Sequence, residues 1–393
     1  MSWAGPFQYD LGKSGRPAPA RQRSYPADAP TLLCLSHLRW SFVYQRPQHL
    51  MTRFAEDWPV LFFEEPIASE RAEPWLEERE EEGVRVLVPR LPPDCTAAAA
   101  EDAQRRLIDD YLARNPPARL LLWYYTPMAL GFSEHLEAAA VVYDCMDELS
   151  AFLGAPPALI ERENRLLERA DLVFTGGYSL WQAKSRRHAN VHAFPSSVDL
   201  DHFARAREEQ SDPPDQAEIP HPRLGFYGVI DERFDLALLD EVARRRPDWQ
   251  FVMLGPVAKI DPARLPRRNN LHFLGGKVYD ELPRYLAGWD VALMPFALND
   301  ATRFISPTKT PEYLAGGRPV VSTPIADVVR GYGDSGLVRF AASPTAFVGA
   351  CAAALADARD RATLCRRADA LLAGMSWDDT RARMKERIEW LMS

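Results

Sequence analysis

Short and almost continuous apolar runs recur along this 393-residue chain, with helical patterns between them. A strand that is buried on both faces has this continuous character, whereas a strand with one wet face alternates. In the first half the runs are Thr31–Leu35, Val60–Glu64, Val84–Val88, Leu120–Tyr124, Val141–Tyr143 and Leu172–Thr175. Arg85 interrupts the third run, which favours an edge position for that strand. Strand followed by helix, repeated, predicts an α/β fold with a doubly wound parallel sheet.

A second series of the same kind follows a break in the pattern. Residues 205–222 carry many charges and four prolines, and we expect them to link two domains. Helical patterns are expected at 235–246, 279–287, 309–315, 343–357 and 377–392. The runs between them are Arg223–Tyr227, Gln250–Leu254, Leu271–Phe273, Val291–Pro295, Val320–Ser322 and Leu337–Phe340. The predicted division is a disordered leader (1–30), a first domain (31–204), the linker, a second domain (223–376) and a final helix (377–393).

Composition narrows the class of ligand and the compartment. The 55 acidic residues outnumber the 47 Lys and Arg, and the net charge of -8 argues against a nucleic-acid polymer as partner. Five scattered cysteines without a C-x-x-C predict neither a disulfide framework nor a zinc site, and favour a reducing cytoplasm. No window approaches the ~20 apolar residues of a membrane span. Peripheral contact with the inner face of the cell membrane stays open.

Common catalytic motifs are absent or lack their context. The chain has no G-x-x-x-x-G-K-[ST], G-x-S-x-G or H-E-x-x-H. The glycines at 331, 333 and 336 spell G-x-G-x-x-G but precede a strand, whereas dinucleotide binding needs them after one. Asp199 and Asp201 form a D-x-D that would suit a metal-bound diphosphate, or simply a turn between domains.

The densest cluster of chemistry-bearing residues is the segment 305–322 (ISPTKTPEYLAGGRPVVS). Ser306 and the polar residues after it open a helix, two glycines end it, and the next strand begins with Val320. A helix start favours phosphate oxygens, and Lys309 in the first turn adds a positive charge. Glu312 lies one turn on and can accept hydrogen bonds from a ribose diol. The alternative is a capped surface helix with an ordinary ion pair.

This segment resembles the donor-binding signature of GT-B glycosyltransferases, in the large retaining family of bacterial polysaccharide enzymes. Residues 196–203 (SSVDLDHF) resemble that family's Asn-Gly-Val-Asp-x-x-x-Phe at the end of the first domain, and residues 46–51 (RPQHLM) look like its teichuronic-acid-type branch. The resemblance runs from residue 30 to 393. It implies a GT-B fold, in which two Rossmann-like domains face a cleft and the C-terminal helix packs back on the first domain.

The same resemblance implies a donor site in the second domain. Arg233 and Lys309 would clamp the diphosphate and Glu312 would bind the ribose, with further contacts from Gly228, Pro256, Val278, Ser306 and Thr308. Two departures stand out. Phe304 replaces the first of the family's paired glutamates, and the loop after Gly228 keeps one cation instead of two. For Arg233 the alternative is a solvated pair with Glu232 or Asp235.

Candidates for chemistry in the first domain follow predicted strands. His37 and Arg46 lie in the loop after the first strand; Arg46 could steady a phosphate on the acceptor side, or start a helix together with Pro47. Asp144 and Asp147 follow another strand, and either could serve as general base if the reaction inverts configuration. The alternative for Asp147 is a helix cap. Glu64 is a further acceptor-side candidate.

The resulting hypothesis is a glycosyltransferase that moves a sugar from a nucleoside-diphosphate sugar, UDP-sugar favoured, to a saccharide or lipid-linked saccharide. No cofactor and no obligatory metal are expected, because positioning and leaving-group stabilisation would drive the reaction. Two alternatives remain: a GT-B sugar-nucleotide epimerase and a non-catalytic nucleotide-sugar-binding protein. The sequence leaves retaining and inverting chemistry both open.

Overall fold

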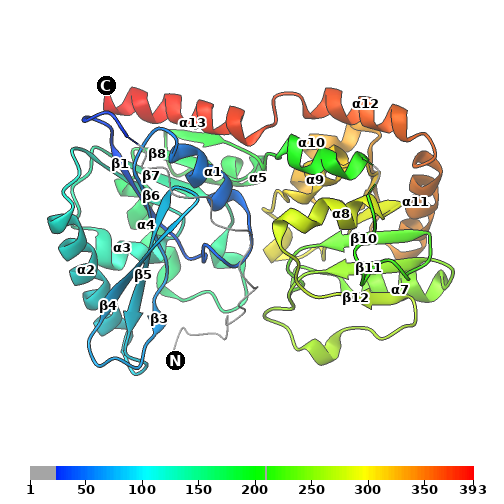
Figure 1. The fold of residues 1–393 in the computed structure, drawn as a ribbon, viewed down its shortest axis with the longest axis horizontal. Coiled ribbons are helices and arrows are strands. Elements are labelled where there is room, and N and C mark those ends of the chain that lie inside the picture. The colour runs from blue at the N-terminus through cyan, green and yellow to red at the C-terminus, as the bar shows by residue number, and fades with distance from the viewer. Residues whose placement is uncertain (1–23, 209) are drawn as a thin grey trace.

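The computed structural model describes residues 24–208 and 210–393. Two sheets lie side by side, each with helices on both faces (Figure 1). Two consecutive helices run along the top of the view, α12 (Arg361–Leu372) over the second sheet and α13 (Trp377–Met392) over the first. The expected leader falls mostly on residues 1–23, outside the described residues.

The first sheet has nine strands, parallel except for one hairpin. Its order is β3-β5-β2-β1-β6-β7-β8-β9, with β4 antiparallel to β5. Val84–Val88 is not an edge strand, because the longer strand that contains it pairs with β2 on one side and with β3 and β4 on the other. The bounds are β1 Thr31–Leu35, β2 Val60–Phe63, β3 Ile67–Ala68, β4 Trp75–Glu81, β5 Val84–Leu91, β6 Leu120–Tyr124, β7 Ala140–Cys145, β8 Leu172–Thr175 and β9 Val191–Ala193.

Helices cover both faces of this sheet, and each face has its own apolar cluster. Leu50 and Phe54 of α1 lie in the cluster on one face. Tyr111 of α2 and Leu166 of α4 lie in the cluster on the other. The helices of this part are α1 Arg46–Phe54, α2 Ala97–Arg114, α3 Leu130–Ser133, α4 Ala158–Arg169 and α5 Tyr178–Lys184. We call residues 24–194 together with α13 the N-terminal body.

The second sheet is six-stranded, all parallel, in the order β12-β11-β10-β13-β14-β15. Two three-strand halves therefore meet at β10 and β13, a switch point where open α/β sheets bind ligands. The strands are β10 Arg223–Tyr227, β11 Gln250–Leu254, β12 Leu271–Phe273, β13 Val291–Met294, β14 Val320–Ser322 and β15 Val338–Phe340. The helices are α6 Leu200–Ala204, α7 Leu236–Arg245, α8 Leu282–Ala287, α9 Lys309–Ala315, α10 Ala326–Tyr332, α11 Pro344–Asp357 and α12 Arg361–Leu372.

The chain crosses between the two clusters just after β9. Phe194 is buried in the first body's cluster and Val198 in that of the second. Residues 205–222 then lie along the second body, where Ile219 is buried and Gln216 accepts a hydrogen bond of 2.9 Å from the Trp289 indole. We call residues 198–372 the C-terminal body.

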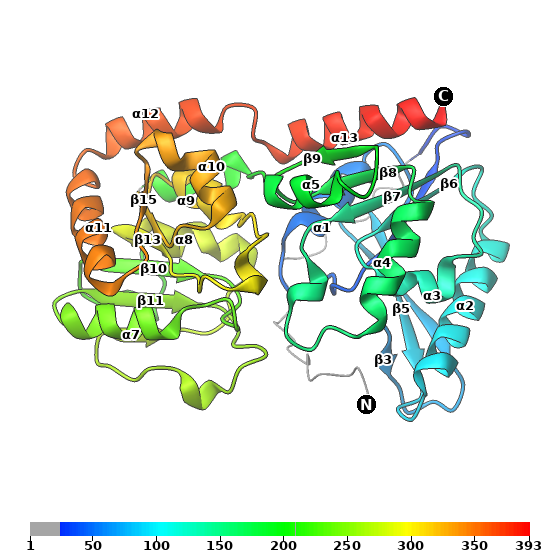
Figure 2. The same cartoon turned by 180° about the vertical axis from the view of Figure 1, so that it is seen from behind.

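Helix α13, Trp377–Met392, returns to the N-terminal body, as the resemblance implied. Figure 2 shows α13 running along the N-terminal body, and its buried residues Trp377, Met384 and Ile388 complete the cluster that α1 covers. Arg381 and Lys385 pair with Asp57 at 2.9 and 2.8 Å. Within residues 24–208 and 210–393, no helix combines the length and the apolar character that crossing a bilayer requires.

Candidate active site

Two glycines bring the loops at the carboxyl edge of the second sheet into close contact. Gly228 follows β10 with a φ of 142°, and a Cβ there would lie 2.3 Å from Cε of Lys309. Gly255 follows β11 with a φ of 138°, and its Cβ would lie 1.9 Å from the Gly228 carbonyl oxygen. The amide of Ile230 donates to the Pro256 carbonyl at 3.0 Å. Only glycine fits these approaches, so the two loops form one ledge beside Lys309.

Lys309 is a half-buried cation with no acidic partner at ion-pair distance among the described residues. Burial lowers the pKa of its ammonium, and the charge of Arg233 lowers it further, while Glu312 and Asp231 oppose the shift. The ammonium lies 5.8 Å from the ring centre of Phe226. An unpaired cation above a glycine ledge is suited to binding an anion.

Glu312 is buried one turn along α9, with 6% of its surface exposed. Its carboxylate accepts a hydrogen bond of 2.8 Å from the Tyr227 hydroxyl at the end of β10. Burial raises the pKa of this carboxyl, and the positive charge of Lys309 opposes that rise. One oxygen of the Glu312 carboxylate is thus bound by Tyr227, and the positive charge of Lys309 partly offsets the negative charge of that carboxylate.

The remaining predicted donor residues lie around the start of α9 and the end of β12. Thr308 precedes the helix, and the Ser306 carbonyl accepts a hydrogen bond of 2.5 Å from the Ser196 hydroxyl of the segment between the bodies. Pro311 carries no N–H, so the helix start offers fewer donors than its sequence suggests. Val278 directly precedes Tyr279, whose ring stacks on His202 at 4.2 Å.

Arg233 is paired within its own loop. Its Nε and Nη2 donate to the Asp231 carboxylate at 3.0 and 2.6 Å, and Asp231 is 4% exposed. The partner is therefore neither Glu232 nor Asp235. The guanidinium also lies 5.4 Å from the ring centre of Phe152, which belongs to the loop after β7 in the other body.

Asp147 lies in that same loop and faces the cations of the C-terminal body. Burial raises the pKa of its carboxyl to about 6, although the positive charges of Arg233, Arg46 and Lys309 oppose the rise. The predicted base candidate and the predicted diphosphate clamp therefore lie close together, although they come from different bodies.

Asp144 and Arg46 do not have the roles predicted for them. Arg46 donates to the Asp144 carboxylate at 2.9 and 2.8 Å and to the Phe194 carbonyl at 2.8 Å. The exposed fractions are 3% for Arg46 and 0% for Asp144. A carboxylate held on both oxygens inside the protein cannot take a proton from an acceptor, and the buried guanidinium cannot reach a phosphate. The pair is a structural lock between α1 and β7.

Glu64 is likewise sequestered, and His37 is neutral. Glu64 is 2% exposed and accepts a hydrogen bond of 2.7 Å from the Trp40 amide, which corrects its predicted acceptor-side role. Burial and the charge of Lys259 lower the pKa of His37 to about 4. Its Nδ1 is buried without a hydrogen-bond partner in the described part of the chain, and the structure assigns this ring no role in proton transfer.

Several aromatic residues meet near the junction between the bodies, and the sequence did not predict that they would contact each other. The ring of Tyr279 stacks on Tyr44 at 4.8 Å, and the ring of His49 stacks on Trp377 at 4.7 Å. Phe304, at the position of the missing glutamate, packs against the cluster of the N-terminal body. Rings at positions so far apart in the chain form no local pattern, and therefore spacing could not have identified them.

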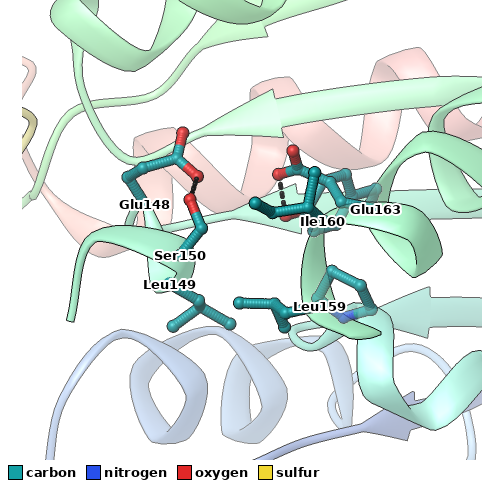
Figure 3. Close-up of a pocket in the computed structure, with 8 residues that line it drawn as sticks. Glu148, Leu149, Ser150, Leu159, Ile160 and Glu163 are labelled. Carbon is teal, nitrogen blue, oxygen red and sulfur yellow. Dashed lines mark hydrogen bonds between the residues drawn. The ribbon is translucent and has the colours of Figure 1, made fainter. Parts of the chain in front are cut away.

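Two cavities of the N-terminal body lie outside this junction. One of about 10 Å³, room for a single water, lies between Leu149 and Leu159 beside Glu163 (Figure 3). The other, of about 440 Å³, is lined by the starts of β1, β2 and β5, at the opposite edge of the sheet.

Across the described residues, no group of three or more His, Cys, Asp or Glu is placed to hold a metal ion.

Comparison with known sequences supports the resemblance stated above. Residues 221–357 match the family model described as Glycosyl transferases group 1. Over 224 residues the chain is 27% identical to TuaH of Bacillus subtilis (strain 168), to which a role as teichuronic acid biosynthesis glycosyltransferase is assigned. That alignment spans 52% of this chain and 55% of the relative, so about half of each protein is compared.

Solved structures share the arrangement of both bodies. Sucrose-phosphate synthase from Thermosynechococcus elongatus has a TM-score of 0.69 at 15% identity, over 92% of this chain and 99% of its own. The UDP-forming trehalose-phosphate synthase from Burkholderia vietnamiensis scores 0.65 at 14% identity, with the same two coverages. An E. coli trehalose-6-phosphate structure bound with UDP-2-fluoro glucose scores 0.64 at 13% identity, again with the same coverages. The chain therefore has the GT-B fold that these structures share.

Proposed function

We propose that this protein is a glycosyltransferase that moves a sugar from a nucleoside-diphosphate sugar to a saccharide acceptor. The observation that carries the proposal is that Lys309 and Glu312 lie one turn apart at the switch point. One is a half-buried cation with no acid at ion-pair distance among the described residues, and the other is a buried carboxylate. A diphosphate and a ribose diol are complementary to these two groups.

The steps follow from the charges around the junction. Lys309 and Arg233 neutralise the negative charge that grows on the diphosphate as the bond to the sugar breaks. Glu312 holds the ribose and so fixes the nucleotide. If configuration inverts, Asp147 accepts the proton of the acceptor hydroxyl, since a pKa of about 6 leaves it ionised at neutral pH and still basic. If configuration is retained, oxygens of the leaving diphosphate take that proton instead.

Donor and acceptor classes are proposed from the relatives. The solved neighbours include UDP-forming synthases and one structure with a UDP-sugar analogue bound, which favours UDP-sugars here. The role assigned to TuaH, in teichuronic acid biosynthesis, supports an acceptor that belongs to a polysaccharide. We propose that this acceptor is a saccharide or a lipid-linked saccharide, met at the cytoplasmic face of a membrane. We propose that no metal is obligatory, and we expect the activity to survive EDTA.

Nucleotide binding tests the proposal directly. Calorimetric titration of UDP, GDP and dTDP should give one preferred nucleotide, and Lys309→Ala and Glu312→Ala should each weaken its binding by tenfold or more. Arg244→Ala is the matched control, because this arginine is exposed on α7 and bound only to the neighbouring Glu241. Unchanged binding by both site variants, with both folded, would contradict the assignment.

Turnover separates the two alternatives. A sugar-nucleotide epimerase would convert a UDP-sugar to its epimer with no acceptor present. A non-catalytic binding protein would bind the nucleotide sugar and release neither sugar nor nucleotide over long incubation. A glycosyltransferase slowly hydrolyses its donor in the absence of acceptor, and acceptor speeds that release.

A further inference from the structure

Among the described residues, Glu232 is a carboxylate without a hydrogen-bond partner, and it lies at the switch point of the second sheet. Both of its oxygens are buried, and neither accepts a hydrogen bond from any described residue. The nearest cation is Lys259, with Nζ 3.8 Å from one oxygen, a separation too long for a hydrogen bond. A buried acceptor that makes no hydrogen bond lowers the stability of the folded protein. Such a group therefore calls for a hydrogen-bond donor from outside the chain.

The backbone around Glu232 is fixed from both sides. Its carbonyl accepts a hydrogen bond of 3.2 Å from the Asn299 amide, and the next carbonyl, of Arg233, accepts one of 2.8 Å from Ala297. On the other side, Ile230 pairs with Val257 in an isolated bridge. The loop thus lies between the connections after β11 and β13, and the carboxylate has a defined place.

Charges around this carboxylate favour an uncharged donor. Arg233 is its chain neighbour, and Lys259 is the cation at 3.8 Å. A metal ion placed here would meet these positive charges. A hydroxyl donates a hydrogen bond without adding charge, and a carboxylate has two oxygens for a pair of neighbouring hydroxyls.

The neighbours also place the carboxylate toward the other body. Lys259 has a φ of 60°, unusual for a residue with a side chain, and its ammonium lies 5.0 Å from the ring centre of Phe152. Phe152 contacts Arg233 as well, at 5.4 Å. Glu232 therefore lies on the side of the diphosphate clamp that faces the N-terminal body, where the sugar attached to the diphosphate must lie.

We infer that Glu232 accepts hydrogen bonds from hydroxyls of the transferred sugar and sets which sugar is accepted. The inference rests on the proposed function, because the diphosphate places the sugar. It also accounts for Phe304: the acid that the resemblance expects at that position is replaced by one from the loop after β10. No bond forms or breaks at Glu232, which binds and selects.

The test compares binding of nucleotide and nucleotide sugar in Glu232→Gln. Kd is measured for UDP, UDP-glucose, UDP-galactose, GDP and GDP-mannose, and the ratio of the nucleotide Kd to the sugar-nucleotide Kd gives the contribution of the sugar. We expect nucleotide binding to stay within twofold of the unmodified protein. The preferred sugar nucleotide should lose about ten- to a hundredfold, the range for hydrogen bonds to a charged group. The ratio of the Kd values for UDP-glucose and UDP-galactose should also move toward one in Glu232→Gln.

Two further variants make the result decisive. Glu281→Gln makes the same chemical change at an exposed position of the C-terminal body and should leave every Kd unchanged. Lys259→Met tests whether Glu232 serves only to hold that lysine, because such a role predicts the same loss in both variants. An equal loss in both, or an unchanged sugar contribution in Glu232→Gln, would overturn the inference. If the unmodified protein binds no nucleotide at all, the proposed function itself fails, which is a separate outcome.

Discussion

Arg46 and Asp144 show how a charge can be placed inside a protein for structure alone. The guanidinium has three acceptor oxygens within 2.9 Å, and the carboxylate has both oxygens occupied. Arg46→Ala would leave Asp144 charged and unpaired in the interior, which typically costs about 3–5 kcal/mol. Urea unfolding should show that loss. The exposed Arg244→Ala should change stability by less than about 0.5 kcal/mol, and a similar loss in both variants would contradict the structural role.

Asp147 makes stability depend on pH in a direction that its burial fixes. The pKa of Asp147 is about 6 in the folded protein and about 4 in the unfolded chain. Between about pH 4 and pH 6 the folded state therefore keeps a proton that the unfolded state has released. Stability therefore falls as pH rises through that window. Asp147→Asn cannot ionise, so relative to the unmodified protein it should gain about 2 kcal/mol between pH 4 and pH 7.5. Urea unfolding at both pH values measures the gain, and an equal difference at both would contradict it.

Residues of the proposed donor site were predictable where they share one short segment. Lys309 and Glu312 lie on one helix, so their spacing alone placed them together. Arg46 and Asp144 each follow a strand, as active-site residues do, and nothing in their local sequence reveals that they bind each other over 98 positions. Glu232 was considered only as a partner of Arg233, because burial without a partner is a property of the folded chain.

At the scale of elements, β10 and the segment after α8 require a residue without a side chain at Gly225. A Cβ there would lie 2.0 Å from the ring of Trp289, which belongs to the core cluster of the C-terminal body, and Gly225 is itself buried. Gly225→Ala should therefore destabilise by about 1–3 kcal/mol, the usual cost of overpacking. Gly349→Ala is the matched control, because it lies in α11 with nothing within 4 Å of its Cβ and should stabilise by about 0.5–1 kcal/mol. Thermal unfolding of both variants should shift in opposite directions.

The elements were predictable to the extent that burial imposes a pattern. Ten of the predicted strands agree with β1, β2, β6, β8 and β10–β15 to within a residue at each end, because buried parallel strands are short apolar runs. Strand β4 escaped prediction, since Trp75–Glu81 is mostly charged and has an edge place in the sheet. The edge assignment for β5 rested on Arg85 and was wrong, because the unpredicted strands β3 and β4 both pair with β5 on that side.

At the scale of the molecule, the last helix, α13, packs in the same apolar cluster as β1 and α1 from the start of the described chain. Trp377 is fully buried and stacks on His49 of α1. Trp377→Ala should cost about 3–5 kcal/mol, as for large core aromatics. Hydrogen exchange should locate that loss in β1, β6 and α1, while the amides of β10 and β13 keep their protection. Loss of protection in both sheets to the same degree would show that the two bodies unfold as one unit.

The return of α13 also sets an order for synthesis on the ribosome. The N-terminal body emerges first, but its apolar face at Phe54 and Trp123 stays open until Trp377 and Ile388 have been translated. The C-terminal body takes Met375 and Ser376 from the segment after α12 but no residue of α13 in its core cluster. Its core can therefore close before α13 has been translated. We expect the half that is made second to be finished first, leaving the nascent first half dependent on chaperones until its last helix arrives.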